Sequence, residues 1–296
     1  MRRVYIIGSI NTDLVIGAQR LPRMGETVHG TDFFINAGGK GANQAVAAAK
    51  LGADVRFCAR VGADLFGRDL RAGLERQGVD TRFVREAAGC SSGVALITVV
   101  DGNNCIVLSA GANAALGKDA AAECLAEAEE GDILLLQMEI SPETVLYALR
   151  EGKRRGMTVL LNPAPAANVT DELIRACDVL IPNETEAMLL AGESGAAAAA
   201  EKLSLRCPHV IVTAGEHGCL LAEGGRVTPF SCPKVQTVDT TAAGDTFCGA
   251  LAVRLARGDA LTGAIGFALR AASLAVTRRG AQCSIPTEEE VLAFGG

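Results

Sequence analysis

A short polar turn late in the chain holds residue types that suit phosphoryl transfer. It spans residues 237–247 as T-V-D-T-T-A-A-G-D-T-F and opens into a helical segment. Backbone N–H groups in the first turn of a helix lack partners inside the helix and can bind an anion. The small residues Ala242, Ala243 and Gly244 let a phosphate approach closely. Asp245 could then take the proton of an attacking hydroxyl. An N-capping aspartate, worth about 1 kcal/mol to a helix, explains A-A-G-D alone equally well.

A second glycine-rich turn precedes an alanine-rich helical segment near the N-terminus. It spans residues 36–47 as N-A-G-G-K-G-A-N-Q-A-V-A. It is not a P-loop, because the first P-loop glycine is missing and Gly41 replaces the serine or threonine. It is not a dinucleotide fingerprint, because Gln44 stands in place of the third glycine. The turn suits a small polar ligand approached by the backbone, Lys40 and Asn43. A tight strand-to-helix connection explains the glycines alone, and Lys40 would then be a solvated surface lysine.

The elements that must position these turns alternate between apolar runs and helical patterns. Short apolar runs predict buried strands at Val4–Ile7, Ile133–Leu136, Val159–Leu161, Val179–Ile181 and Val210–Thr213. Helices are predicted at Gly41–Leu51, Leu65–Gln77, Pro142–Arg155, Glu184–Leu190, Ala196–Leu205, Thr246–Ala256 and Leu261–Thr277. Continuous apolar strands separated by helices predict a mainly parallel α/β sheet covered on both faces. Ligands bind beyond the carboxyl ends of the strands in such a sheet.

Two segments, 12–36 and 91–109, interrupt this alternation. Within the second, Ser92–Val100 and Cys105–Ser109 flank the turn D-G-N-N, which is a pattern typical of a β-hairpin. The pattern by itself favours equally a small second sheet and two irregular excursions from the main fold.

Composition limits the classes of protein that remain. The chain has 296 residues, 49% of them hydrophobic and 4% aromatic with no Trp, which predicts an aliphatic core in one large domain or two small ones. The net charge of −6, without a basic run, argues against a nucleic-acid partner. Ten scattered cysteines without a C-x-x-C spacing predict buried reduced thiols and a cytoplasmic location. The apolar run Val4–Ile7 is too short for a signal peptide, and no apolar stretch is long enough to span a membrane.

The order of these motifs resembles the ribokinase family of sugar kinases. G-G-K-G-A-N-Q-A-V-A-A-A and D-T-T-A-A-G-D-T-F are its paired signatures, and further matching segments are Gly8–Asp13, Pro22–Thr27, Gln137–Glu139, Asn162–Ala166, Pro182–Ala187 and Thr277–Ala281. The likeness runs from about Val4 to about Pro286. It implies a ribokinase-like three-layer α/β/α sandwich with a mainly parallel central sheet and a small β-sheet lid. The implied unit is a single domain over residues 1–296, with a lid formed by about 12–36 and 91–109.

The resemblance also implies a set of site residues. The implied sugar-binding positions are Asn11, Asp13, Gly39, Lys40, Gly41, Asn43, Glu139 and Asp245. Side chains that exchange hydrogen bonds with hydroxyls suit a neutral polyol. Asp245 matches the general base, and Ala242, Ala243 and Gly244 match the backbone anion hole that stabilises the transferring phosphoryl group.

The resemblance implies ATP with Mg²⁺ as the phosphoryl donor and K⁺ as a monovalent activator. Asn183 and Glu186 match positions associated with Mg²⁺ and phosphates; Thr213, Gly215, Glu216, Gly218 and Gly244 match the nucleotide contacts. The matching K⁺ ligands are Asp239, Thr241, Ala275, Arg278, Gly280 and Ser284, several of them through backbone carbonyls. Relatives carry other small residues at Cys248 and Cys283, and we expect Cys248 to be a buried thiol.

The implied reaction is ATP-dependent phosphorylation of D-ribose at O5, which gives ribose 5-phosphate and ADP. A homodimer formed through the lid is also implied. Alternatives are a family kinase for 2-deoxyribose, another pentose, a nucleoside or a fructose phosphate, although Arg20 and Arg23 match no motif for a phosphorylated sugar. A non-catalytic sugar-binding protein would not need Asp245, and an oxidoreductase would need the missing glycine fingerprint.

Overall fold

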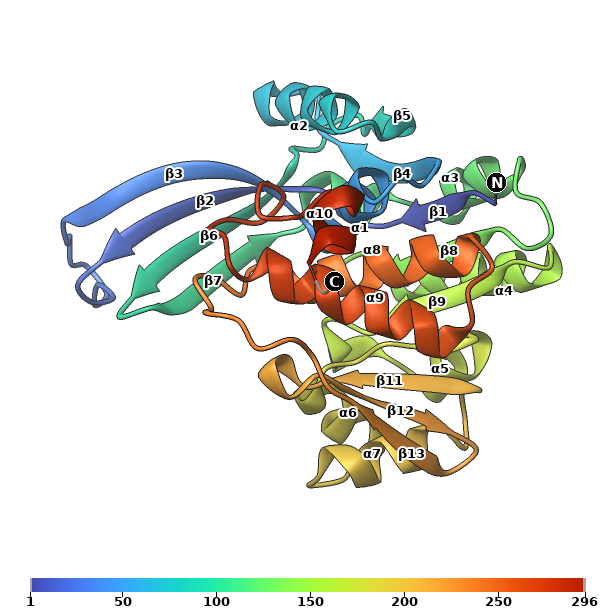
Figure 1. The fold of residues 1–296 in the computed structure, drawn as a ribbon. Coiled ribbons are helices and arrows are strands. Elements are labelled where there is room, and N and C mark those ends of the chain that lie inside the picture. The colour runs from blue at the N-terminus through green and yellow to red at the C-terminus, as the bar shows by residue number, and fades with distance from the viewer. Residues whose placement is uncertain (1, 295–296) are drawn as a thin grey trace.

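The computed structural model describes residues 2–294, which form a nine-stranded sheet and a separate four-stranded sheet (Figure 1). The strand order in the large sheet is β13-β12-β11-β10-β9-β8-β1-β4-β5. The strands are β1 (Val4–Ile7), β4 (Val55–Val61), β5 (Asp80–Glu86), β8 (Ile133–Gln137), β9 (Thr158–Asn162), β10 (Val179–Leu180), β11 (His209–Thr213), β12 (Cys219–Glu223) and β13 (Arg226–Phe230). All neighbours from β11 to β5 pair in parallel, and β12 and β13 add an antiparallel edge.

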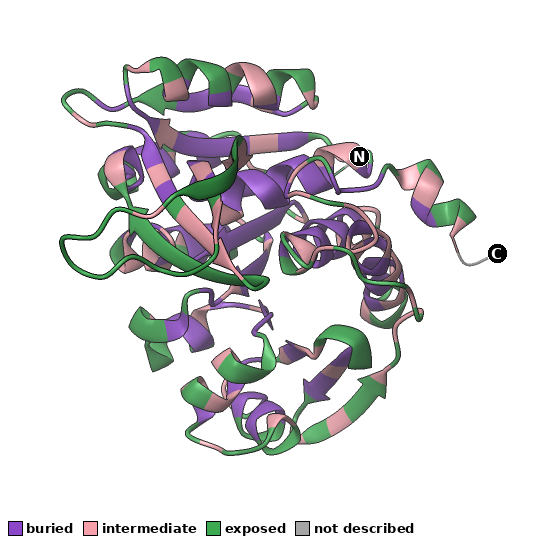
Figure 2. Cartoon of the chain, turned by 90° about the vertical axis from the view of Figure 1, so that its left-hand side faces the viewer, coloured by how far each residue is buried: buried purple, intermediate pink, exposed green. Residues whose placement is uncertain are grey.

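Helices cover both faces of the large sheet. One apolar core contains residues of α1 (Lys40–Lys50), α2 (Leu65–Arg76), α8 (Ala243–Ala256), α9 (Leu261–Ala275) and α10 (Glu288–Ala293). The other contains residues of α3 (Lys118–Leu125), α4 (Pro142–Arg154), α5 (Asp171–Ala176), α6 (Glu184–Ala191) and α7 (Ala196–Leu203). In β1, Val4 and Ile6 face the first core while Tyr5 and Ile7 face the second. Figure 2 shows the strands buried between the helices, which confirms the predicted three-layer sandwich.

The smaller sheet is built from the two segments that interrupt the main alternation. It contains β2 (Asn11–Ala18), β3 (Gly30–Gly38), β6 (Gly93–Val100) and β7 (Asn103–Ser109) in the order β3-β2-β6-β7. The β6–β7 turn is Asp101-Gly102, and both residues have positive φ, as two-residue hairpins with a matching twist require. The sheet projects from the main body (Figure 1). This decides the open alternative in favour of a second sheet.

Predicted element boundaries agree with the structure to within about two residues, with one informative exception. The late helix begins at Ala243 and not at Thr246, because Ala242 adopts a left-handed conformation (φ 60°) and serves as the N-cap. Asp245 therefore lies inside the first turn of α8. Short 3-10 turns also occur at η1 (Gly111–Ala115), η2 (Ala166–Asn168) and η3 (Gly215–His217).

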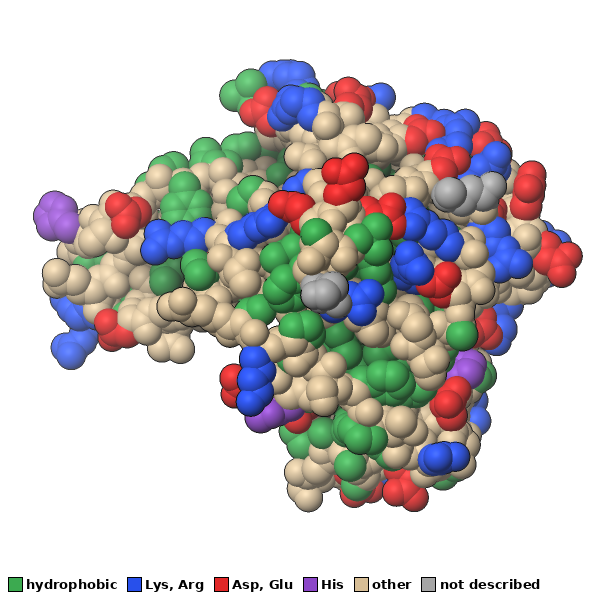
Figure 3. Space-filling view, viewed as in Figure 1, with side chains coloured by type: hydrophobic (Ala, Val, Ile, Leu, Met, Phe, Trp, Pro, Cys, Tyr) green, Lys and Arg blue, Asp and Glu red, His purple; other side chains and the backbone are tan. Residues whose placement is uncertain are grey.

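The mixed surface charges agree with the composition, whereas the predicted burial of the cysteines is confirmed only in part. Lysines and arginines alternate with carboxylates over the face shown in Figure 3. All ten cysteines are free, but only six are buried; Cys105 and Cys283 are exposed. Burial raises the pKa of Cys248 well above its usual range, so its thiol stays neutral.

In the stretch from residue 2 to residue 294, none of the helices combines the length and the apolar character needed to cross a bilayer.

Candidate active site

Three cavities adjoin at the N-terminus of α8. A cavity of about 1040 Å³ lies under the small sheet, one of about 290 Å³ lies beside α8, and one of about 620 Å³ lies beyond it. Lys40, Ala242 and Asp245 line both the first and the second cavity. Thr213, Ala243 and Gly244 line both the second and the third. The three cavities therefore form one continuous path, and Asp245 lies where the first two meet.

Asp245 is held by two side-chain amides. Its side chain is only 7% exposed, and Asn43 Nδ2 donates to one carboxylate oxygen while Gln44 Nε2 donates to the other, each at 3.0 Å. Its carboxylate caps no helix, because Ala242 is the N-cap and makes no side-chain cap bond. The N-capping explanation is therefore wrong, and the carboxylate is oriented by α1 toward the cavities.

The turn before Asp245 presents backbone donors. The Ala243 N–H donates to Thr240 O at 3.2 Å. Within residues 2–294 the N–H groups of Gly244 and Asp245 have no acceptor. A side chain at Gly244 would meet no atom within 4 Å, so its backbone faces open space. Two free N–H groups at the positive end of a 14-residue helix form an anion site between the cavities.

Lys40 begins α1 and lines two of the cavities. Burial disfavours its charged form, but the negative charges of Asp245, Glu139 and Glu186 outweigh this and raise the pKa of Lys40. It is therefore a largely desolvated cation and not a solvated surface lysine. Gly39 makes this placement possible: its φ is +87°, and a Cβ there would lie 2.8 Å from the Asn11 backbone nitrogen.

Carboxylates from two other elements face the large cavity. Glu139 follows β8, and its Oε2 accepts hydrogen bonds from Ser9 Oγ at 2.6 Å and the Lys40 N–H at 3.0 Å. Its Oε1 is left for a ligand. Asp13 lies on β2, on the face of the small sheet that lines the large cavity. Burial raises the pKa of Asp13 to about 7, and the charges of Glu139 and Asp245 act in the same direction.

The side chain of Asn11 is oriented by Asn113, a residue that was not predicted from the sequence. Asn113, in η1, donates from Nδ2 to Asn11 Oδ1 at 2.7 Å. The Asn113 side chain is itself fixed by the Ile10 backbone, through bonds of 2.9 and 3.2 Å. Because Asn11 Oδ1 is occupied, its amide N–H₂ is the group available to the cavity. Nothing in the local sequence separates Asn113 from an ordinary turn residue.

Gly41 differs from its predicted neighbours because it lines none of the three cavities. Its N–H donates to Ser9 Oγ at 3.3 Å, and a Cβ at this position would lie 2.7 Å from the Ser9 backbone nitrogen. The glycine therefore allows α1 to approach the loop after β1. Gly41 therefore lies behind Lys40 and Asn43, which line the large cavity.

Asn183 and Glu186 form a capping box at the start of α6. Asn183 Oδ1 accepts from the Glu186 N–H at 2.8 Å, and Glu186 Oε2 accepts from the Asn183 N–H at 2.9 Å. Both line the smallest cavity, together with Lys40 and Asn162. Burial raises the pKa of Glu186 even though Asn183 and Lys40 act against this. Glu186 Oε1 is the oxygen left for a hydrated cation or a phosphate-bound metal.

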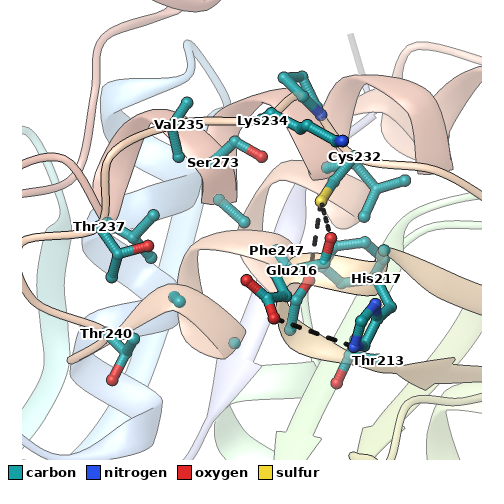
Figure 4. Close-up of a pocket in the computed structure, with 18 residues that line it drawn as sticks. Thr213, Glu216, His217, Cys232, Lys234, Val235, Thr237, Thr240, Phe247 and Ser273 are labelled. Atoms are coloured by element: carbon teal, nitrogen blue, oxygen red, sulfur yellow. Dashed lines mark hydrogen bonds and ion pairs between the residues drawn. The ribbon is translucent and has the colours of Figure 1, made fainter.

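The cavity of about 620 Å³ lies between the η3 loop and the α8–α9 pair (Figure 4). The predicted residues Thr213, Gly215, Glu216 and Gly218 form one side. The other lining residues were not predicted. Cys232 lies against the η3 loop, where its Sγ donates to Glu216 O at 3.2 Å, and the remaining lining residues include Lys234, Val235, Thr237, Phe247, Leu269, Ala272, Ser273 and Val276. Helical positions such as Phe247 and Leu269 are indistinguishable from core residues by sequence pattern. An apolar wall facing a polar loop suits a flat heteroaromatic base.

Two loops bring Asp239, Thr241 and Gly280, three of the predicted monovalent-cation residues, into contact. The Val238 and Asp239 N–H groups donate to Val276 O, and the Gly280 N–H donates to Asp239 Oδ2 at 2.9 Å. Burial disfavours the charge of Asp239, but hydrogen bonds from Thr241 and Gly280 outweigh it and lower its pKa. The Arg278 side chain turns away to pair with Glu290, so only its backbone carbonyl could serve. Oxygen atoms from both loops fit a weakly hydrated cation.

Comparisons with known proteins show which family the chain is similar to. Residues 1–288 match the pfkB family of carbohydrate kinases. The chain is 40% identical to a ribokinase of Bacillus subtilis, over 98% of each chain, and 36% identical to a deoxyribokinase of Salmonella typhi, over 97% of this chain and 96% of the relative. The ribokinase structure from Thermotoga maritima superposes with a TM-score of 0.91 at 38% identity, over 99% of each chain. That of Arabidopsis thaliana ribokinase complexed with ribose and ATP gives 0.88 at 34% identity, over 99% of this chain and 98% of the other.

The chain therefore belongs to the pfkB family of carbohydrate kinases. Its fold is the ribokinase-like α/β fold with a small additional sheet.

Proposed function

We propose that the protein phosphorylates D-ribose at O5 with ATP, giving ribose 5-phosphate and ADP. The observation that carries this proposal is the position of Asp245, a buried carboxylate at the junction of a polar, lid-covered cavity and a phosphate-sized cavity that leads to an apolar pocket. Ribokinases similar over nearly the full chain support ribose as the acceptor.

The transfer step uses few chemical groups. Asp245 accepts the proton of the O5 hydroxyl as O5 forms a bond to the γ-phosphorus, and the bond from that phosphorus to the β–γ bridging oxygen breaks to leave ADP. The free N–H groups of Gly244 and Asp245 and the cationic Lys40 stabilise the negative charge on the transferring group. The proton later leaves Asp245 for solvent.

The sugar is held by groups with complementary roles. Asp13 and Glu139 Oε1 accept hydrogen bonds from hydroxyls, whereas the amides of Asn11 and Asn43 can donate to them. A site built of buried polar groups discriminates against analogues that lack a hydroxyl, because those groups lose their partners. We keep 2-deoxyribose as the second candidate acceptor, since a deoxyribokinase is among the similar proteins.

Two cations complete the proposal. Asn183 and Glu186 would hold Mg²⁺ on the ATP phosphates, where it neutralises charge that develops during transfer. The carbonyls of Ala275, Arg278 and Gly280, with the side chains of Asp239, Thr241 and Ser284, would hold K⁺. Asp239 and Thr241 are followed directly by Ala242, so a cation there would stiffen the strained turn that carries the anion site.

The small sheet is proposed as a lid and as the contact between two copies. On its outer face Ile35, Leu14, Leu96 and Val107 are paired across all four strands and form one apolar row. Ile35, Leu96 and Val107 are 55%, 52% and 65% exposed, and Figure 3 shows hydrophobic side chains gathered over this part of the molecule. Pairing with the same row of a second copy would remove this surface from water.

Free cysteines throughout the chain agree with a cytoplasmic location.

The test is ADP release from ATP, Mg²⁺ and K⁺ with a panel of acceptors, and with Asp245→Asn beside the wild type. The panel contains ribose, 2-deoxyribose, other pentoses, fructose, fructose 6-phosphate and nucleosides. Ribose is expected to give the highest kcat/KM. A different leading acceptor would refute ribose as the substrate, and binding of ribose without turnover of any acceptor would favour a binding protein.

A further inference from the structure

The carboxylate of Asp245 is supported from behind by a chain of buried side-chain amides. Gln44, on α1, is fully buried and donates from Nε2 to Asp245 Oδ1 at 3.0 Å and to Asn162 Oδ1 at 3.2 Å. Its Oε1 accepts from Gln137 Nε2 at 2.6 Å. Both amide hydrogens and the oxygen of Gln44 are therefore used within the protein, so Gln44 has no group left for a ligand.

The polarity of this chain is fixed by chemistry. An ionised carboxylate only accepts hydrogen bonds, so Gln44 must present its N–H₂ to Asp245. Its carbonyl oxygen then points away and requires a donor, which Gln137 supplies. A reversed Gln137 amide would place two carbonyl oxygens 2.6 Å apart. The orientation of Gln137 thus determines which group Gln44 offers to Asp245.

Gln137 makes this contact at a structural disadvantage. Its Oε1 is buried and has no hydrogen-bond partner among the described residues. The oxygen lies against Gly8, at the end of the neighbouring strand β1, and a Cβ at Gly8 would overlap it. A buried acceptor without a partner destabilises a fold, and an apolar side chain of the same shape would avoid that penalty. The presence of glutamine at this position is explained by its Nε2 donor, which bonds to Gln44 Oε1.

We infer that Gln44 and Gln137 are positioning residues for the catalytic base, acting through Asp245 and not on the substrate. The inference rests on the proposed function. Asn43 holds one carboxylate oxygen from the cavity side and Gln44 holds the other from the protein side. Together they fix the plane of the carboxylate. Loss of the Gln44 donor frees the carboxylate to rotate and slows proton transfer.

The test compares Gln44→Met, Gln137→Met, the double variant and Gln77→Met, which replaces a glutamine outside the site. Met has nearly the shape of Gln but no donor. With ribose and ATP, kcat should fall about tenfold for Gln44→Met and severalfold for Gln137→Met, with both KM values within about twofold of wild type. The double variant should be no slower than Gln44→Met, because Gln137 acts through Gln44.

Thermal unfolding separates positioning from folding. Gln137→Met should unfold close to the wild-type temperature, because removal of the unpartnered Gln137 oxygen offsets the loss of the donor to Gln44 Oε1. Wild-type kcat in both single variants would overturn the inference, and so would multiplicative losses in the double variant. If Gln44→Met does not fold, Gln137→Met decides by the same measurements. A wild type without ribose-dependent ADP release would instead refute the proposed function.

Discussion

Asp245→Asn is the substitution with the sharpest expected result. The carboxylate accepts one bond from Asn43 and one from Gln44, each at 3.0 Å. A carboxamide keeps the shape but can accept only one of them, and its own N–H₂ must then face the other donor. The variant therefore loses the proposed proton acceptor and also gains a mismatched contact.

The size of the effect follows from the role of the base. A positioned general base contributes about 10²- to 10⁴-fold to the rate, which is about 3–5 kcal/mol of transition-state stabilisation. Lys40 loses one of the three carboxylates that raise its pKa but keeps Glu139 and Glu186. Its positive charge should therefore persist, and the affinities for ribose and ATP should change only about threefold or less.

The assay is a coupled measurement of ADP release at saturating ribose and ATP, with binding of each ligand measured by calorimetry. Asp69→Asn is the matched control, because Asp69 is exposed on α2 and lies outside the three cavities. The reasoning is refuted if Asp245→Asn keeps more than about a tenth of the wild-type kcat. It is refuted equally if turnover falls only in proportion to lost binding.

Three further predictions concern the cations, the lid and the acceptor site. Replacing Na⁺ by K⁺ at constant ionic strength should raise wild-type activity severalfold, and Asp239→Ala should abolish the response because its carboxylate joins the two cation loops. Val107→Asp should convert the proposed dimer to a monomer in sedimentation, because it places a charge in the apolar row of the small sheet. For the protein without ligands, Asp13→Asn should raise the unfolding temperature at about pH 8, and by a smaller amount at about pH 5. The folded pKa of about 7 lies above the usual 3.8, so wild-type stability falls as pH rises between these values, by at most about 4 kcal/mol.

Each of these predictions has a contrasting outcome. Equal activity in Na⁺ and K⁺ would remove the cation site from the proposal. Leu205→Asp, which alters a residue 69% exposed outside the lid, should leave the dimer intact, and a monomer in that variant as well would show that the lid is not the specific contact. A pH-independent difference between Asp13→Asn and the wild type would show that the Asp13 carboxyl does not titrate in this window.

Local sequence patterns were sufficient for much of the fold. The runs that became β1, β8, β9, β10 and β11 are apolar along their whole length because both faces are covered, and this pattern predicts a parallel sheet. The antiparallel edge β12–β13 was not predicted, since half-exposed strands such as Arg226–Phe230 carry a weaker pattern. The sequence favoured equally a small second sheet and two irregular excursions. Only the structure decided between them, because strand pairing across some eighty residues leaves no local signal.

The candidate site divides in the same way. Glycine-rich turns, Lys40 and Asp245 were identifiable because their backbone conformations and charges demand particular residue types at fixed spacing. Asn113, Gln44 and Gln137 were not, because each acts through a partner far away in the chain, as Gln44 does with Asp245, 201 residues later.

The sequence by itself therefore determined the fold class, the two phosphate- and sugar-directed turns and the identity of the candidate base. Only the tertiary structure decided that two of the three cavities meet at Asp245, that Gly41 lies behind the residues that line them, and that buried amides orient the carboxylate. The physical reason is that hydrogen-bond partners and cavity walls are defined by distances between elements. The order of residues along a chain constrains those distances only after the sheet and its helices have packed.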